Sequence, residues 1–514
     1  MRFLRRDYRH SFPVCAVLVV LFSLFWHGCT NYDVFFMYRH GADLLAGNWD
    51  RSSDFLSMHG WLPFMHQKWA MCLATYWIYD TFGVMGINVA GAACFTVTGL
   101  LAFFVCEDLY PGGEYRNVLQ PVVLMALLCN DFLFSFRPHV IAGWALLLEL
   151  WALERHAAGS IRTGPFLLAM AAASAVTMWF HGTMWYLCFI PLLPYLFEFR
   201  FLGRLPFGLS AEPVRKLPLL LAVPAIVLAG VLNPYGIGQI RYLLLTMSSL
   251  DSSKFWYMSE IKPFAYVLEY VDGIHVCVWL VWMLFSGILL LRSRRVRGIF
   301  FWIGSALMMA VAMRLTFQAL LFTWFAASRD LTLRRVDRDG APAAGLESWA
   351  VLAVAVACLA GQFLAMQFRY GPDGTPVFGA WRSTDMLFEE YARISDAMVL
   401  DSGKPDPTFL SIDTNLAAYV ESRGPRAFID TRCELYAEPD GNGVSVLDSL
   451  SFLKEPDDPD GAAPILDRVS ALLDYYDVQY VVVYSFYRND FSDALVSRCD
   501  VVYDDGVYAI YSPS

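Results

Sequence analysis

The chain has 514 residues, of which 57% are hydrophobic and 17% are charged, and its formal net charge is −10. Soluble domains carry about 25% charged residues, and apolar runs of roughly 17 or more residues are too long for ordinary core helices. This composition excludes a soluble enzyme, a disordered chain and a disulfide-stapled secreted module. It predicts a polytopic α-helical membrane protein with a soluble part attached.

The charge is divided unequally along the chain. Residues 371–514 hold 26 acidic and 10 basic residues, whereas residues 1–370 hold 22 acidic and 28 basic residues. An acidic domain repels phosphates, so the tail argues against nucleic acid as a partner. The 11 cysteines are scattered without a CxxC pair, so no zinc or redox motif is visible. We therefore expect a transmembrane domain at 1–370 and a separate domain at 371–514.

Apolar stretches predict about eleven membrane-spanning helices. They lie at roughly 11–28, 85–105, 118–135, 138–154, 163–181, 183–199, 216–232, 271–291, 298–312, 314–328 and 348–367. The first stretch follows the basic segment MRFLRRDYRH, and no small-x-small cleavage site comes after it. We interpret it as an uncleaved first span, with a cleaved signal peptide as the alternative.

Lysine and arginine in short loops predict the orientation of the spans. The basic loops are the N-terminus and the segments 155–162, 200–216, 292–298 and 329–338. If these loops are cytoplasmic, eleven spans satisfy every loop, provided that the stretch 62–82 does not cross. The N-terminus is then cytoplasmic, and both the loop 29–84 and the C-terminal domain are extracytoplasmic.

The predicted external loop 29–84 is aromatic and carries the first candidate catalytic residue. Its apolar residues recur at helical spacing from Val34 to Leu45, which predicts a helix lying on the membrane interface. Asp33 stands directly before this pattern, at the outer end of the first span. It is a candidate catalytic base, and a helix-capping carboxylate is the plainer interpretation.

The same loop is dense in acids and histidines. Asp54 is a second candidate carboxylate, with an exposed loop acid as the alternative, and His66 is a candidate on the substrate side. The stretch from Asp33 to His66 holds four further residues of this kind: His40, Asp43, Asp50 and His59. Such density on one loop indicates an acid–base or metal site, although the ligands of a metal cannot be named.

Further candidates lie at the predicted outer ends of other spans: Arg137, His139, His181, Glu260 and Arg314. Arg314 interrupts the apolar stretch MMAVAMRLTFQALL. A charge there is costly unless it is paired or hydrated, so it is a functional hypothesis by default. A hairpin turn at the lipid headgroups is the alternative.

The tail alternates short apolar runs with helical patterns. The segments PTFLSI, RAFID, VQYVVVYS and VVYDDGVYAIYS predict strands, and 384–400, 414–422, 463–476 and 489–497 predict helices. This alternation is typical of an α/β domain with a mostly parallel sheet. No GxGxxG, phosphate loop or nucleophile elbow is present, so we expect an accessory role. Whether Cys433 and Cys499 form a disulfide is open.

Several motifs and their order along the chain resemble those of the GT-C superfamily of polytopic glycosyltransferases, in particular an uncharacterised bacterial branch. The resemblance runs from about residue 11 to the C-terminus. It depends on Asp33, Arg137-Pro138, Trp179 with His181-Gly182, Asn233 to Gly236 with Glu260, and Ile429-Asp430 with Arg432, Leu435 and Tyr436. Two positions depart from the branch. Lys68-Trp69 replaces a frequent Glu-Trp pair, and Ile261 replaces a tryptophan after Glu260, so the roles of those residues cannot be transferred.

The resemblance implies an integral membrane enzyme that moves a sugar from a polyprenyl-phosphate-linked donor to an acceptor hydroxyl at the outer face of the membrane. Asp33 would deprotonate the acceptor, and Asp54 would serve the acceptor or a metal. The leaving phosphate needs positive charge, for which His66, Arg137, His139 and Arg314 are the candidates, and His181 and Glu260 are further candidates for binding the substrate. A divalent cation could supply that charge. The sugar, the acceptor and the cofactor stay unidentified.

Two other classes of protein fit parts of the pattern. A transporter or lipid flippase would explain the many spans and the buried charge, but internal repeats in matching halves are not visible. A non-catalytic envelope-assembly protein of the same architecture would explain the two departures. Convergence of Asp33, Asp54 and an arginine on one groove would favour a transferase.

Overall fold

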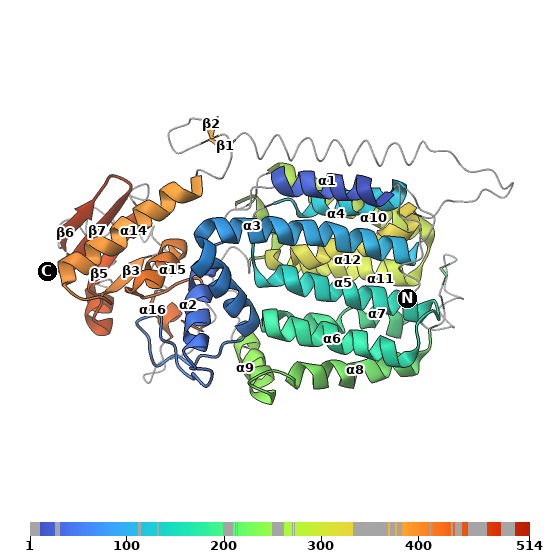
Figure 1. Cartoon of the computed structure of the whole chain (residues 1–514), viewed down its shortest axis with the longest axis horizontal. Helices are drawn as coiled ribbons and strands as arrows, with labels where there is room; N and C mark the ends of the chain where they lie inside the picture. The colour runs from blue at the N-terminus through green and yellow to red at the C-terminus, as the bar shows by residue number, and fades with distance from the viewer. Residues whose placement is uncertain are drawn as a thin grey trace. The chain divides into compact units, whose positions relative to one another are not determined.

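The structure is a computed structural model of the whole chain (Figure 1). It describes residues 11–25, 31–110, 115–130, 133–198, 209–210, 212, 214–248, 262–269, 271, 273–332, 369–370, 376–377, 383–411, 413–432, 435–436, 445–450, 470–484 and 499–513. The predicted span 348–367, the predicted helix 489–497, Glu260 and Cys433 lie outside these residues.

The chain divides into two compact units. One, here called the helical unit, comprises residues 1–29, 84–237 and 258–380. The other, here called the mixed unit, comprises residues 30–83, 238–257 and 381–514. The sequence analysis assigned the loop 29–84 to the membrane domain, whereas in the structure nearly all of this loop belongs to the same unit as the tail.

The helical unit is built from apolar helices whose positions follow the predicted spans. Its helices are α1 (Ser11–Phe25), the second part of α3 (Trp69–Leu109), α4 (Tyr115–Leu128), α5 (Pro138–Ala157), α6 (Thr163–His181), η2 (Gly182–Phe189), α7 (Leu192–Leu196), α8 (Lys216–Val231), η5 (Phe264–Glu269), α10 (Gly273–Ser293), α11 (Val296–Val311), η6 (Met313–Leu315) and α12 (Thr316–Thr332). A two-stranded pairing of β1 (Arg369–Tyr370) and β2 (Pro376–Val377) follows.

Three helical segments of the described chain are long and apolar enough to cross a membrane: Trp69–Leu109, Thr163–Leu196 and Gly273–Ser293. Shorter apolar helices occupy Asn117–Leu128, Lys216–Val231 and Val296–Val311.

Local chemistry sets several helix ends. Pro138 begins α5 after the extended residue Arg137, because proline lacks the N–H that a first helical residue leaves unpaired. Gly83, with φ 60° and ψ −152°, interrupts α3 at a conformation that glycine alone adopts readily.

Ion pairs gather the basic segments at one end of the helical unit. The guanidinium of Arg297 binds Glu154 at 2.9 Å and Glu198 at 2.6 Å, and it stacks 4.3 Å from the centre of the Tyr195 ring. Further pairs join Arg295 to Asp330 at 2.8 Å, Arg329 to Glu212 at 2.9 Å and Arg155 to Asp108 at 3.4 Å. The basic loops that follow separate helices in the sequence therefore lie together.

The mixed unit contains the predicted α/β fold. A five-stranded sheet has the order β4-β3-β5-β7-β6, with β3 (Thr408–Ser411) parallel to both β4 (Arg426–Ala427) and β5 (Tyr480–Tyr484). The hairpin β6 (Cys499–Asp504) and β7 (Tyr508–Pro513) adds antiparallel pairs. The helices α14 (Ser383–Ser402), α15 (Thr414–Arg423) and α16 (Val446–Ser449) belong to the same unit. The sheet is thus mixed, because the last two strands form the predicted hairpin.

The helix α2 (Asp33–Leu45) packs between the tail helices and the start of α3. Its Phe35 ring contacts Phe388 of α14 and Tyr419 of α15, with ring centres 5.4 and 4.8 Å apart. A Cβ added to Gly41 would lie 2.3 Å from the carbonyl oxygen of Cys72, so only glycine lets α2 approach α3 this closely. The remaining helix of this unit is α9 (Ile237–Ser248).

Candidate functional site

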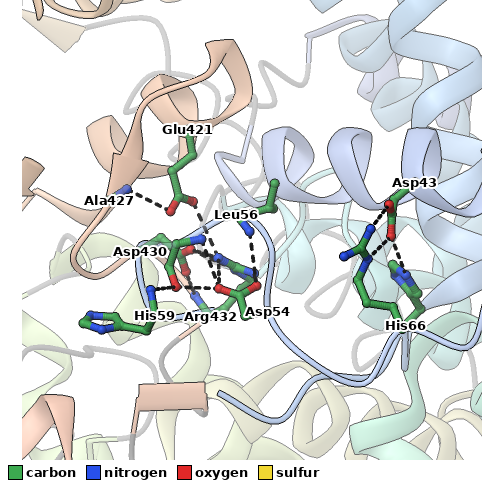
Figure 2. Close-up of polar contacts among 11 residues, drawn as sticks. Asp43, Asp54, Leu56, His59, His66, Glu421, Ala427, Asp430 and Arg432 are labelled. Atoms are coloured by element: carbon green, nitrogen blue, oxygen red, sulfur yellow. Dashed lines mark hydrogen bonds and ion pairs between the residues drawn. The ribbon is translucent and has the colours of Figure 1, made fainter. Parts of the chain in front are cut away.

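The most densely charged group in the mixed unit surrounds Arg432 (Figure 2). The guanidinium of Arg432 donates from Nη1 to Asp54 Oδ1 at 2.5 Å and from Nε to Asp430 Oδ2 at 2.8 Å. A further contact joins Arg432 Nη2 to Asp430, and Glu421 Oε2 lies 3.7 Å from the same nitrogen. All four side chains are buried. We call Asp54, Glu421, Asp430 and Arg432 the arginine cluster.

Burial and charge set the protonation states in the arginine cluster. Burial and the neighbouring Asp430 raise the pKa of Glu421 well above its usual value. Burial alone would raise the pKa of Asp54, but Arg432 and hydrogen bonds from Ser57 hold it below its usual value. The cluster therefore places three acidic side chains around one buried guanidinium.

Asp54 is fixed by the segment that follows it. Its Oδ2 accepts hydrogen bonds from the backbone N–H of Ser57 at 3.0 Å and from the Ser57 hydroxyl at 2.5 Å. The His59 Nε2–H donates to the backbone carbonyl of Phe428 at 2.9 Å, and burial lowers the pKa of His59 to about 4. Both carboxylate oxygens of Asp54 accept hydrogen bonds, and 3% of its surface is exposed. The side chain is therefore fixed in place and closed to bulk solvent.

A second polar group surrounds Asp43 on α2 (Figure 2). Arg51 donates to both of its oxygens, at 2.5 and 2.6 Å, and the Asn48 amide donates to Oδ1 at 2.8 Å. His66 Nε2 lies 3.3 Å from Asp43 Oδ2. Burial lowers the pKa of His66 to about 4 despite this carboxylate, so the contact is one between a neutral imidazole and an anion.

A small cavity of about 20 Å³ lies beside these groups within the mixed unit. Its lining includes His40, His66, Lys68, Tyr242 and Arg432. The rings of His40 and His66 are 5.3 Å apart, and His40 Nε2 and both ring nitrogens of His66 are buried without a well-aligned hydrogen bond to any described residue. A cavity of this volume holds about one water molecule.

Asp33 is the first residue of α2 and is 8% exposed. Its backbone N–H donates to Asn31 Oδ1 at 2.9 Å, and Tyr32 occupies the N-cap position without a side-chain cap. Asp33 therefore lies in the first helical turn, one position after the cap. The carboxylate is carried by a helix that packs against α15 and the start of α3, which makes it a rigid support.

The remaining candidates lie in the helical unit. His139 Nε2–H donates to the backbone carbonyl of Leu133 at 2.6 Å, and His181 Nδ1 lies 2.9 Å from the Thr183 hydroxyl. Arg137 precedes α5, and Arg314 lies in η6 between α11 and α12. Asn233 closes a turn after α8, with its amide donating to the carbonyl of Gly230 at 2.7 Å.

No set of three or more metal-binding side chains occurs within the part of the chain that the structure describes. Of the predicted residues, the structure brings His66 to the cavity that Arg432 also lines, and it ties Asp54 to Arg432. The sequence analysis missed Glu421 and the roles of His40 and Lys68. The density of histidines on the loop was the signal in the sequence that could have identified His40. Glu421 lies on an ordinary amphipathic helix, so no signal in the sequence indicated its place in the cluster.

No family model matches the chain, and no curated protein matches it. Solved structures do match. The archaeal oligosaccharyltransferase AglB from Archaeoglobus fulgidus, in complex with an inhibitory peptide and a dolichol-phosphate, has a TM-score of 0.56 at 11% identity, covering 99% of this chain and 75% of that one.

Two further structures show the same similarity. The Archaeoglobus fulgidus oligosaccharyltransferase in complex with Zn and sulfate has a TM-score of 0.53 at 13% identity, covering 97% of this chain and 73% of that one. The arabinofuranosyltransferase AftD from Mycobacteria has a TM-score of 0.54 at 12% identity, covering 99% of this chain and 42% of that one. These matches show that the chain shares the fold of these solved structures over nearly its whole length.

Proposed function

We propose that the chain is an integral membrane glycosyltransferase that moves a sugar from a polyprenyl-phosphate-linked donor to an acceptor hydroxyl at the outer face of the membrane. The observation that carries this proposal is the fold. Similarity to transferases extends over 97–99% of the chain and includes both units. One of these neighbours was solved with a dolichol-phosphate, which is a polyprenyl-type phosphate.

Asp33 is the proposed general base. Transfer to a hydroxyl requires removal of its proton while the C–O bond to the sugar forms and the bond to the lipid phosphate breaks. Asp33 stands at the start of a packed helix, directly after the first apolar segment of the chain. Asp54 is proposed to hold the loop in place, because Arg432 and Ser57 already occupy both of its oxygens.

The leaving phosphate is anionic, so positive charge must meet it. We propose Lys68, which lines the cavity, as the cation for this part of the site, with the neutral His66 beside it as a hydrogen-bonding group. Arg137, His139, His181 and Arg314 of the helical unit stay candidates for the same role. A divalent cation could share it. One neighbour was solved with Zn and sulfate, and Asp33 is the carboxylate we would test first as a ligand.

The purified chain, assayed with a panel of donors, tests the proposed reaction class. We expect transfer from polyprenyl-phosphate sugars and none from nucleotide sugars, because no nucleotide motif occurs in the sequence. Adding EDTA and then Mg²⁺, Mn²⁺ or Zn²⁺ decides whether a cation takes part. Turnover of nucleotide sugars alone, or movement of intact lipid-linked sugar across a vesicle without transfer, would contradict the proposal.

The orientation of the chain is a separate prediction. The ion pairs that join Arg297, Arg295 and Arg329 to acids gather the basic segments at one end of the helical unit, as the positive-inside rule expects of cytoplasmic loops. A cysteine at Leu400, which is 86% exposed on α14, should react with an impermeant thiol reagent in intact cells. A cysteine at Arg292 should react only after permeabilisation. The parent chain, with its exposed Cys277, sets the background, and the reverse labelling pattern would overturn the orientation.

A further inference from the structure

The segment between α2 and α3, residues 46–68, is held by isolated contacts. Asp54 N–H donates to the carbonyl of Leu62 at 2.9 Å, and Phe64 N–H donates to Ser52 at 3.0 Å. A single β-bridge pairs Ser53 with Pro63. A chain segment with so little regular structure needs fixed anchors to keep one conformation.

The tail supplies those anchors. Met58 N–H donates to the carbonyl of Ala427 at 3.1 Å, and the His59 ring donates to Phe428. The strongest anchor is the pair of Arg432 and Asp54, which lie 378 positions apart in the sequence. Both partners are buried, at 3% exposure each, so neither can exchange its partner for bulk water. Removing one leaves the other as an uncompensated buried charge, which is strongly unfavourable.

The arginine cluster also borders the elements that carry the proposed site. Arg432 lines the cavity together with His40 of α2 and His66 of the loop. Glu421 of the cluster belongs to α15, which packs on α2. Arg39 of α2 donates to the backbone carbonyl of Ser422 at 3.2 Å, at the end of α15, where the helix dipole favours a cation.

We propose that Arg432 is a positioning residue, through which the tail holds the segment 46–68 and the cavity beside α2 in the geometry that transfer requires. This inference rests on the proposed function for its kinetic consequence, but its structural part stands independently. It gives the accessory role expected of the tail a specific residue, because the tail residue Arg432 contributes to the same cavity as the loop residue His66.

The test compares Arg432→Gln, Arg432→Lys and Asp54→Asn with the control Arg426→Gln. Arg426 is a surface arginine of the same domain, 3.1 Å from Asp406, with both side chains nearly half exposed. Hydrogen exchange of the full-length protein is followed at the amides of Asp54, Met58 and Leu62. The amides of Val482 and Ile510, which belong to the sheet, report on the integrity of the domain.

We expect Arg432→Gln to abolish protection in the loop while protection in the sheet persists, and to lower turnover by about 10²-fold, the scale of a small misplacement of reacting groups. Arg432→Lys keeps the charge and should recover part of both. The double variant with Asp54→Asn should be no worse than Arg432→Gln alone, because Asp54 is then not left as an unpaired buried carboxylate, while Asp430 faces residue 432 in both variants. The control should leave both readouts unchanged.

Unchanged loop protection in Arg432→Gln, with turnover within about twofold of the parent, would overturn the inference. Equal loss of protection in the loop and the sheet in Arg432→Lys would assign Arg432 a purely structural role and would also overturn it. If the parent chain transfers no sugar from any donor, the proposed function fails. The exchange result then still decides whether Arg432 orders the loop.

Discussion

Replacing Asp33 by asparagine is expected to lower turnover by about 10²-fold or more, the usual scale for losing a general base. Asparagine keeps the size of the side chain and most of its hydrogen bonding, but it cannot accept the proton of the acceptor hydroxyl. Steady-state transfer from the lipid-linked donor measures the change. The loss should appear in kcat, because proton removal belongs to the chemical step.

The stability of the protein should change little in this variant. Asp33 occupies the first turn of α2, while the packing of the helix depends on Phe35 and Gly41. Asp50→Asn is the matched control, because Asp50 is an exposed acid of the same segment. An Asp33→Asn protein that keeps its melting temperature and its full activity would remove Asp33 from the mechanism.

Acidification from pH 7 to pH 4 is expected to destabilise the mixed unit strongly. Burial lowers the pKa of His59 and of His66 from 6.5 to about 4, and it lowers the pKa of His40 in the same direction. Between these values the histidines bind more protons in the unfolded chain than in the folded one, so their contribution to stability falls as the pH falls, whereas the raised pKa of Glu421 acts in the opposite direction. For His59 and His66 the difference corresponds to about 3 kcal/mol each at full protonation.

Denaturant unfolding followed by tryptophan fluorescence at pH 7, 5.5 and 4.5 measures this dependence. The pKa values of Asp43 and Asp54 are also lowered, but their contribution is lost only at more acidic pH, below the usual aspartate range. His66→Gln should reduce the slope between pH 6.5 and 4.5, because glutamine cannot take up a proton. A slope that is flat in the parent chain would show that these histidines are hydrated or already charged.

Much of the fold follows from local sequence patterns. The apolar stretches 138–154, 163–181 and 216–232 correspond closely to α5, α6 and α8, because a membrane-spanning helix is specified by its own residues. The helical spacing after Asp33 predicts α2 to within a residue, and the alternating runs of the tail predict β3, β5 and the β6–β7 hairpin. The mostly parallel sheet needed correction, since β6 and β7 pair antiparallel.

The arrangement of the site could not be predicted in the same way. The pair of Asp54 and Arg432 connects segments 378 positions apart, and a single sequence gives no signal of such a contact. For that reason neither the place of the loop 29–84 in the unit of the tail nor the pairing of Asp54 with Arg432 could be predicted. The approach of α2 to α3 depends on the absence of a side chain at Gly41, which reads in the sequence as an ordinary glycine. In the sequence, Asp33 and His66 could be recognised only as an aspartate and a histidine in a loop that is dense in acids and histidines.

The anomeric configuration of the product, compared with that of the donor by NMR, tests the proposed reaction most directly. If Asp33 acts as a base and the acceptor hydroxyl displaces the lipid phosphate in one step, the acceptor attacks the face opposite the leaving group. We therefore expect inversion, with one polyprenyl phosphate released for each sugar transferred. Retention of configuration, or a sugar trapped covalently on Asp33, would instead indicate a double displacement in which Asp33 is the nucleophile, and would contradict the proposed role of a base.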